Sequence, residues 1–259
     1  MGMYKLPTAR PDDEEIKRGM EASFKFLEVG TPELVIPLWA AMWLAPLTEI
    51  LEPAFAMWLY GPTGSMKSTV SALALCHFGE FTDRTLRVQW FDTANSLRLR
   101  TFTAKDVPLI IDDFAPTATS YDARKLEQNA SLVIRSVGNR SGRGRLTRDI
   151  KQRRTFPPRG LVISTGEQEP GGQSVTARLV TVELSADSVV RDPYGNPTLL
   201  SQAQAQAATG AYQNAMAGYL MWLAGQWDDL GPELLQARQD TRVKARQEGA
   251  HLRLPEALA

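Results

Sequence analysis

Apolar and polar positions alternate in blocks along the chain, with short apolar runs separated by longer stretches of helical spacing. Apolar runs of this length that end in glycine or in polar residues are typical of buried strands. In chain order these runs cover residues 54–60, 84–91, 107–114, 159–166 and 178–184. Helical spacing predicts helices at residues 12–29, 32–53 (one or two helices, divided by prolines), 68–79, 93–104, 121–137, 199–227 and 232–248.

Strands that alternate with helices predict an α/β fold, with a parallel five-stranded sheet covered by helices on both faces. Further helices precede and follow this pattern, so we divide the chain into three parts. We expect an N-terminal helical segment at residues 1–53, an α/β core at 54–190 and a C-terminal helical lid or small bundle at 191–259.

The composition is that of an ordinary globular protein, with 43% hydrophobic and 22% charged residues. Cys76 is the single cysteine, so a disulfide framework is excluded, which fits a reducing cytosol. The most apolar stretch, residues 34–47, is interrupted by Pro37 and Pro46 and is too short to span a bilayer. The polar N-terminus also lacks the pattern of a signal peptide. We therefore expect a cytoplasmic protein with no membrane partner.

Positive charge is concentrated in one segment, although the net charge of the whole chain is zero. Residues 135–159 hold nine arginines and lysines against Asp149 alone. Glycines and two prolines in the same segment predict a loop or hairpin rather than a packed element. A concentrated basic segment in a neutral protein indicates a local anionic partner.

The stretch YGPTGSMKST at residues 60–69 follows the pattern of a phosphate-binding loop, between a predicted strand and a predicted helix. In such loops backbone N–H groups face the phosphates, the lysine reaches the β- and γ-phosphates and the next hydroxyl binds Mg²⁺. We therefore predict that ATP and Mg²⁺ bind here, with Lys67 as the cation and Ser68 as a metal ligand. The predicted loop residues are Gly61, Pro62, Thr63, Gly64, Ser65, Met66, Lys67, Ser68 and Thr69.

Met66 stands where the pattern expects its second glycine. The position before the lysine should already enter the helix with a negative φ, where a side chain is sterically allowed. We therefore expect an intact loop in which the Met66 side chain projects away from the phosphates. The alternative is a degenerate site or a chance glycine loop.

Two further strand ends carry polar side chains that suit nucleotide hydrolysis. LIIDD ends in Asp112, expected to hold Mg²⁺ with Ser68, and Asp113, expected to polarise the attacking water. In LVISTGE, Ser164 and Thr165 are candidates for contact with the γ-phosphate or the water, and Thr165 is the one we select as catalytic. For each of these residues, ordinary strand-end or turn chemistry is the alternative.

Arg178 precedes the last predicted strand. In a ring ATPase an arginine at this place reaches the γ-phosphate of the neighbouring subunit and stabilises the charge of the transition state. A surface arginine that caps the preceding helix is the alternative interpretation.

Taken in order, these features resemble AAA+ ATPases, in particular the helicase-type branch that includes minichromosome-maintenance and superfamily 3 proteins. GPTGSMKST, IIDDFAP, IRSVGNRSGRGR and PPRGLVISTGEQEPGGQSVTARL look more closely like the ATPase domains of mobile-element and phage replication proteins. The resemblance covers about residues 54–185. It implies an AAA+-like ATPase core with a central phosphate-loop strand, a ring that is expected to be a hexamer, and ATP between subunits. A primase-type domain often accompanies such domains. Met66 and Asp113 depart from the usual glycine and glutamate, and minichromosome-maintenance helicases carry alanine at the place of Met66.

The basic segment occupies the place where helicase-type AAA+ proteins insert a hairpin into the ring channel. Arginine matches phosphate geometry, so we expect contacts to the backbone of single-stranded DNA that do not depend on sequence. The predicted contact residues are Arg140, Arg143, Arg145, Arg148, Lys151 and Arg153. As an alternative, some of the arginines, Arg135 and Arg140 first, face a neighbouring subunit.

These expectations lead to three functional hypotheses. The first is an ATP-hydrolysing DNA translocase or helicase of a mobile-element or phage replication system. The second is an AAA+ initiator, loader or remodeller that acts on a protein partner. The third is a structural ring subunit that binds nucleotide and scarcely hydrolyses it.

Overall fold

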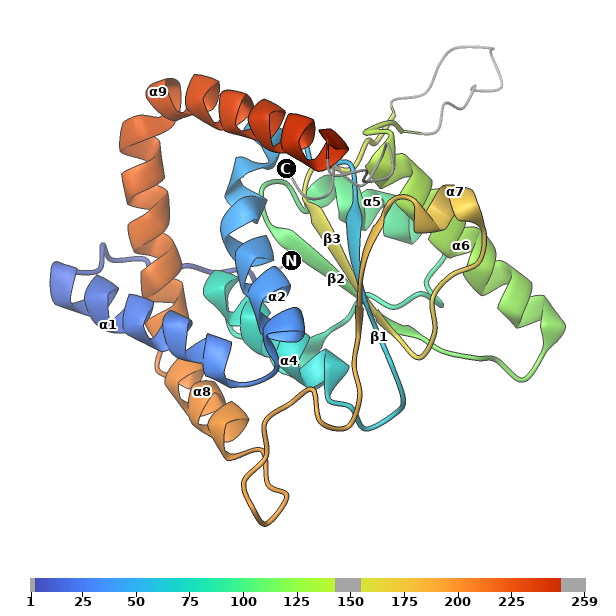
Figure 1. The fold of residues 1–259 in the computed structure, drawn as a ribbon, viewed down its shortest axis with the longest axis horizontal. Helices are drawn as coiled ribbons and strands as arrows, with labels where there is room; N and C mark the ends of the chain where they lie inside the picture. The colour runs from blue at the N-terminus through green and yellow to red at the C-terminus, as the bar shows by residue number, and fades with distance from the viewer. Residues whose placement is uncertain (1–2, 143–154, 248–259) are drawn as a thin grey trace.

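The computed structural model describes residues 3–142 and 155–247. Its sheet is parallel and consists of strands β1 (Ala56–Tyr60), β2 (Pro108–Phe114), β3 (Leu161–Gly166) and β4 (Leu179–Glu183), in the order β2-β3-β1-β4 (Figure 1). Strand β1, which leads into the predicted phosphate loop, lies between β3 and β4, as expected. All parallel strands end at the same edge of the sheet, so the loop, the end of β2 and the end of β3 meet there.

The sheet has four strands, so the prediction of five was wrong. Residues 84–91 form no strand and make one isolated parallel bridge, from Gln89 to Asp112. The start of this segment forms a 3₁₀ turn at Asp83–Thr85, in which the Thr82 N–H donates to Thr85 Oγ1 at 2.8 Å. A second turn follows, in which the Asp92 N–H donates to the Gln89 carbonyl at 3.0 Å. Local bonds of this kind compete with strand pairing and leave room for a single bridge.

The helices follow the predicted alternation with the strands but differ from the prediction in their bounds, and the short helix at Gln173–Thr176 was not predicted. They are α1 (Asp13–Lys25), α2 (Pro32–Leu44), α3 (Thr48–Leu51), α4 (Lys67–Leu75), α5 (Ala94–Thr103), α6 (Ser120–Gly138), α7 (Gln173–Thr176), α8 (Thr198–Ala208) and α9 (Ala211–Gln247). Helix α1 begins with a capping box, in which Glu15 N–H donates to Asp12 Oδ1 at 2.7 Å and Asp12 N–H donates to Glu15 Oε2 at 2.9 Å.

Helices cover both faces of the sheet, as the alternating pattern predicted. Met57 and Leu59 of β1 pack in a core with α1, α2, α4 and α8. Trp58, on the opposite side of the same strand, packs in a second core with α5 and α6. Figure 1 shows these two helical layers on either side of the sheet. Side chains that alternate between two buried faces explain why β1 is apolar along its whole length.

The C-terminal helices differ from the prediction. Residues 211–247 form one long helix, α9, with Pro232 inside it, where two helices were expected. Proline removes one backbone donor and bends a helix without having to end it, and α9 changes direction along its length in Figure 1. The helix packs along α1 and α3. Its Arg238 Nη1 donates to the Leu51 carbonyl at 2.5 Å. In the described residues α9 therefore lies against α1 and α3, and it does not form the predicted lid over the loop.

One helical stretch in the described ranges, Pro32–Leu51, is long and apolar enough by composition to cross a membrane. In the structure it consists of α2, a 3₁₀ turn that contains Pro46, and α3. Leu38 and Met42 are completely buried, and they belong to the core that α2 forms with the sheet. This packing agrees with the interpretation of the stretch as core helices.

A buried histidine joins the N-terminal helices to the core. His77 is completely buried, and its Nδ1 lies 2.7 Å from the Ala74 carbonyl oxygen, so Nδ1 carries the proton of the neutral ring. Its Nε2 then accepts from the Ser23 hydroxyl at 2.7 Å, and that hydroxyl oxygen accepts from Trp39 Nε1 at 2.9 Å. Burial lowers the pKa of His77 to about 4. The network is satisfied only while the imidazole is neutral.

We predict that acid destabilises the protein through His77. The unfolded chain has the higher histidine pKa, so it takes up a proton as pH falls through about 6.5, whereas the folded chain does so only near 4. Stability is therefore full above the upper value and is lost towards the lower one, by about 2 kcal/mol between pH 7 and pH 5. Urea unfolding at both pH values measures this loss. The His77→Gln variant should lose clearly less than wild type over the same interval, and an equal loss would contradict the prediction.

Candidate nucleotide site

The predicted phosphate loop turns sharply between the end of β1 and the start of α4. Gly61 and Gly64 have φ angles of 153° and 85°, in the region that favours glycine. A Cβ on Gly61 would lie 2.1 Å from the Leu184 carbonyl oxygen, so no larger residue fits at the exit of β1. Helix α4 begins at Lys67, and its first backbone N–H groups lie at the end of the turn. Strand, loop and helix thus follow one another as the sequence predicted.

Lys67 lies inside this turn and is bound to it. Its Nζ donates to the carbonyl oxygens of Gly61 and Pro62 at 2.7 and 2.8 Å, and to Ser65 Oγ at 3.1 Å. Burial lowers the pKa of Lys67, and the carboxylates of Glu167 and Asp112 oppose this effect. The ammonium group is therefore held among neutral oxygens, which it can exchange for phosphate oxygens.

The expected backbone of Met66 was wrong. Met66 has φ 64° and ψ 21°, the left-handed conformation, and caps α4 instead of entering it. The helix starts at Lys67, because the chain still turns at Met66. A residue with a Cβ in this conformation costs about 1 to 2 kcal/mol. The side chain lies at the cavity wall and packs partly against the apolar core.

The first acid of LIIDD is the centre of the polar contacts. Ser68 Oγ donates to Asp112 Oδ1 at 2.8 Å, and the Thr165 hydroxyl donates to the same oxygen. The structure thus brings together three residues that the sequence selected, from α4, β2 and β3.

Mg²⁺ fits the residues present at this contact. Hydroxyl and carboxylate oxygens are ligands that it prefers, and it commonly keeps waters and takes up phosphate oxygens besides one or two protein ligands. Ser68 and Asp112 would hold the ion. In the described ranges no group of three or more His, Cys, Asp or Glu side chains is placed to hold a metal without such help.

Asp113 lies at an irregularity in β2. The pairing of β2 with β3 shifts between Ile111 and Phe114, and Asp113 has a φ of 65°. Its N–H points to Thr165 Oγ1 at 3.4 Å. Partial burial raises the pKa of Asp113, and the negative charges of Asp112 and Glu167 raise it further. The bulge redirects the Asp113 side chain, which lines the cavity and takes no part in the hydrogen bond between Asp112 and Ser68.

A cavity of about 410 Å³ lies between these elements. Its walls include Lys67, Asp112 and Thr165, together with three polar residues that the sequence analysis did not select: Asp83, Gln89 and Glu167. The Thr63 hydroxyl donates to a Glu167 carboxylate oxygen. The signal for Glu167 was its place directly after the polar end of β3 in STGE, beside the two residues that were considered.

Arg178 lies at the amino ends of the strands, opposite the end that carries the phosphate loop. It precedes β4, and its carbonyl accepts from the N–H of Ala56 at the start of β1, at 3.0 Å. Its Nη2 donates to Asn139 Oδ1 at 2.9 Å, and its Nη1 bonds the Ser174 carbonyl. The carboxyl ends of β1 and β4 lie at the opposite edge, so Arg178 is separated from the phosphate loop of its own chain.

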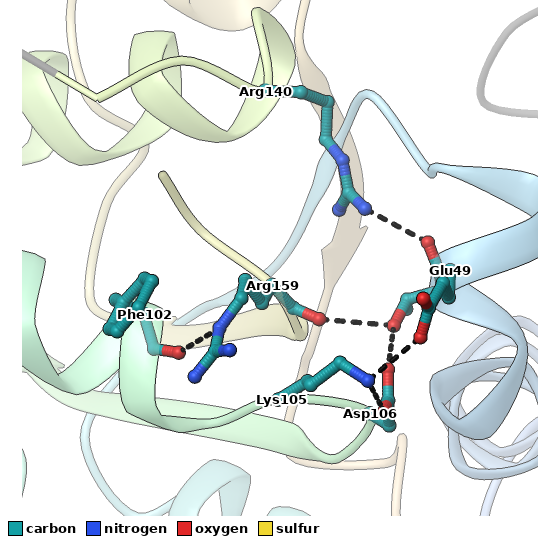
Figure 2. A network of polar contacts seen from close by, with 7 residues as sticks. Glu49, Phe102, Lys105, Asp106, Arg140 and Arg159 are labelled. Atoms are coloured by element: carbon teal, nitrogen blue, oxygen red, sulfur yellow. Dashed lines mark hydrogen bonds and ion pairs between the residues drawn. The ribbon is translucent and has the colours of Figure 1, made fainter. Parts of the chain in front are cut away.

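Of the predicted DNA contacts, the structure describes Arg140, and it turns this side chain towards its own chain. Arg140 Nη2 donates to the Thr48 carbonyl at 2.9 Å, and burial lowers the pKa of its guanidinium group (Figure 2). The other five predicted contacts lie outside the described residues: Arg143, Arg145, Arg148, Lys151 and Arg153.

Arg159 and Arg140 meet the same residue of α3 from opposite sides of the undescribed stretch. The Thr48 hydroxyl donates to the Arg159 carbonyl at 3.1 Å, and Arg159 Nε donates to the Phe102 carbonyl at 2.7 Å. Lys105 lies between Glu49 and Asp106, as Figure 2 shows. Its Nζ is 2.7 Å from Glu49 Oε2 and 2.9 Å from Asp106 Oδ2. These contacts anchor both residues at the amino edge of the sheet.

No protein-family profile matches the chain, and no curated protein matches it. Among solved structures it is similar to "SCCmec type IV Cch - active helicase", with a TM-score of 0.55 and 17% identity over 98% of this chain and 45% of that chain. The chain thus spans less than half the length of that structure. At this identity the likeness shows the fold, and it confirms at that level the helicase resemblance that the motifs indicated.

Two further solved structures have lower TM-scores. "The X-ray structure of Inhibitor Bound to JCV Helicase" has a TM-score of 0.41 and 16% identity over 94% of this chain and 68% of that chain. "The A form apo structure of NrS-1 C terminal region-CTR" also has a TM-score of 0.41, with 10% identity over 84% of this chain and 48% of that chain.

The backbone of Met66 can be tested by comparing two variants. Met66→Ala and Met66→Gly both remove the side chain, but only glycine relieves the left-handed strain. We expect the Met66→Gly variant to be more stable than the Met66→Ala variant by about 1 kcal/mol. Chemical denaturation of both proteins measures the difference. With a helical backbone at this position the sign would reverse, since glycine in a helix is less stable than alanine by about 0.5 to 1 kcal/mol.

Proposed function

We propose that this chain is the ATP-hydrolysing motor of a DNA translocase or helicase, of the mobile-element or phage replication type, that works as a ring. One observation carries the proposal: Ser68 at the start of α4 contacts Asp112 at the end of β2 at 2.8 Å, beside the buried Lys67 and a cavity of about 410 Å³. This is the arrangement of hydroxyl, acid and cation that phosphoryl transfer requires.

In the proposed reaction Lys67 leaves the carbonyl oxygens of Gly61 and Pro62 for the β- and γ-phosphates, while the loop amides bond the remaining oxygens. Ser68 and Asp112 would hold Mg²⁺, which would offset the negative charge that develops on the phosphates. Thr165, which bonds Asp112, would orient the γ-phosphate or the water. Asp113, which lines the same cavity, is the acid that the sequence selected to polarise the water.

The ring proposal depends on Arg178. This side chain is separated from the phosphate loop of its own chain, so a role in hydrolysis requires a neighbouring copy, in which it would face the γ-phosphate. Its contacts with Asn139 and Ser174 orient the guanidinium group at the edge of the subunit. We propose a homo-oligomer, with a hexamer as the expected form.

DNA is the proposed partner of the basic segment. This segment carries a concentrated positive charge in the connection between α6 and β3, and DNA is an anionic partner that suits it. Arginines and lysines there would follow the backbone of a single strand. A primase-type domain or a protein partner would complete the replication system. Insensitivity of hydrolysis to DNA, together with stimulation by a protein, would favour a loader or remodeller instead.

We predict that Lys67→Ala lowers ATP hydrolysis by at least about 100-fold, because removal of one preorganised charge in such a site has an effect of this order. A phosphate-release assay with Mg²⁺-ATP measures the rate. The matched control is Lys125→Ala, which removes an exposed lysine on α6 and should leave the rate unchanged. Hydrolysis that survives Lys67→Ala at the wild-type rate would show that the nucleotide site is assigned wrongly.

We also predict that changing Arg143 and Arg145 together to alanine weakens binding to single-stranded DNA. Each lost phosphate contact makes binding less dependent on salt, so the negative slope of log K against log salt should become shallower by about 1.4 for the two contacts. Fluorescence anisotropy with a labelled oligonucleotide at several salt concentrations gives the slope. Arg124→Ala with Lys125→Ala removes the same charge from the exposed surface of α6 and serves as the control. An unchanged slope in the first pair would contradict a role in DNA contact.

A further inference from the structure

Glu167 has a fixed backbone and an exposed side chain at the end of β3. Its N–H donates to the Phe114 carbonyl at 2.8 Å, which joins it to the end of β2. The next residue, Gln168, accepts from Trp58 Nε1 at 3.0 Å, which joins it to β1. The Cα of Glu167 is therefore held between two strands, while its carboxylate can move within the reach of its side chain.

The Glu167 carboxylate lies at the rim of the phosphate loop. It accepts a hydrogen bond from the Thr63 hydroxyl, and both residues line the cavity that contains Lys67. Backbone amides at residues 61–68 would surround the phosphates and Lys67 would reach the β- and γ-phosphates, so a group that bonds Thr63 and shares the cavity of Lys67 would lie near the phosphates of a bound nucleotide. Its present partner is a neutral hydroxyl, which is a weaker partner than a cation and can be exchanged.

Three other acids line the cavity. Asp83 accepts from the Arg84 N–H at 2.8 Å within its own turn, and the two acids at the end of β2 are placed differently from Glu167. Asp112 is engaged by Ser68 and Thr165 on one oxygen, the arrangement that fits a metal ligand. Asp113 is one methylene shorter than glutamate, and it sits on a bulge with a φ of 65°. Glu167 therefore has the longest side chain of these acids, and its carboxylate bonds Thr63 rather than Ser68. A glutamate side chain extends one methylene further into the cavity than the aspartate at position 113.

We infer that Glu167 is the carboxylate that positions the attacking water and accepts its proton. The inference rests on the proposed ATP hydrolysis and adds to it. In this step the water oxygen forms a bond to the γ-phosphorus as the bond from that phosphorus to the bridging oxygen breaks. The electron pair of the broken bond stays on the ADP oxygen, and the proton of the water passes to Glu167 and then to solvent. Thr63, released by Glu167, is free to bond a phosphate oxygen.

Glu167→Gln tests this role because it keeps the size and the acceptor for Thr63 but cannot take up a proton. We expect kcat to fall by at least about 100-fold, within the range that general-base catalysis contributes. The dissociation constant of a fluorescent ATP analogue should change by less than about 3-fold, which also shows that the variant is folded. Glu167→Asp keeps the carboxylate at shorter reach and should retain more turnover than Glu167→Gln.

Three controls separate this role from others. Glu169→Gln changes the next glutamate, which does not line the cavity, and should leave kcat at the wild-type value. Thr63→Val replaces the hydroxyl with a methyl group, and it should lower kcat clearly less than Glu167→Gln, because the Thr63 hydroxyl takes up no proton from the water. Asp113→Asn should retain more turnover than Glu167→Gln, and a larger loss in Asp113→Asn than in Glu167→Gln would assign the water to Asp113 and overturn the inference.

The inference is overturned if Glu167→Gln turns over ATP within about 3-fold of wild type. It is also overturned if Glu167→Gln and Thr63→Val both leave kcat unchanged and tighten nucleotide binding, because Glu167 would then only hold the empty loop closed. If Lys67→Ala abolishes hydrolysis while Glu167→Gln does not, the proposed function stands and this inference alone fails. A wild-type chain that hydrolyses no ATP, with or without single-stranded DNA, overturns both.

Discussion

The candidate site depends on one contact, the hydrogen bond from Ser68 Oγ to Asp112 Oδ1 at 2.8 Å. Residue 68 lies in the first turn of α4, and residue 112 lies near the end of β2, two strand positions away from β1. The contact is possible because β3 alone separates β1 from β2 and all three strands are parallel. The same strand order places Thr165 between them, where it bonds the same carboxylate oxygen. Sheet topology thus assembles groups that are distant in sequence.

Much of this arrangement could be predicted from the sequence, because its signals are local. The four strands of the sheet, Lys67 in its turn, and the acids at the end of β2 follow from apolar runs and their polar ends. The fifth strand was predicted wrongly because residues 82–85 form a turn that is held by hydrogen bonds between Thr82 and Thr85. The pattern of apolar residues does not reveal such bonds. Met66 was misjudged because its φ depends on where the helix starts, and helix starts are poorly determined by pattern. Glu167 was missed because its partner, Thr63, lies 104 residues earlier.

The fold likeness to the Cch helicase structure extends over 98% of this chain, including the N-terminal helices and α9. These helices are therefore part of the shared architecture and not additions to an α/β core. Their packing explains why: α1 lies along α9, and the buried His77 links α1, α2 and α4 through Ser23, Trp39 and Ala74. A division of the chain at residue 53 separates elements that share one hydrophobic core.

Helix α3 has a mechanical consequence that follows from its four residues. Thr48 bonds Arg140 and Arg159, which stand on either side of residues 143–154, and Leu51 accepts from Arg238 of α9. A tilt of this single helical turn would therefore pull on both stems of the connection between α6 and β3 and on the long C-terminal helix at once. α3 thus links three parts of the chain at the amino ends of the strands, opposite the candidate site.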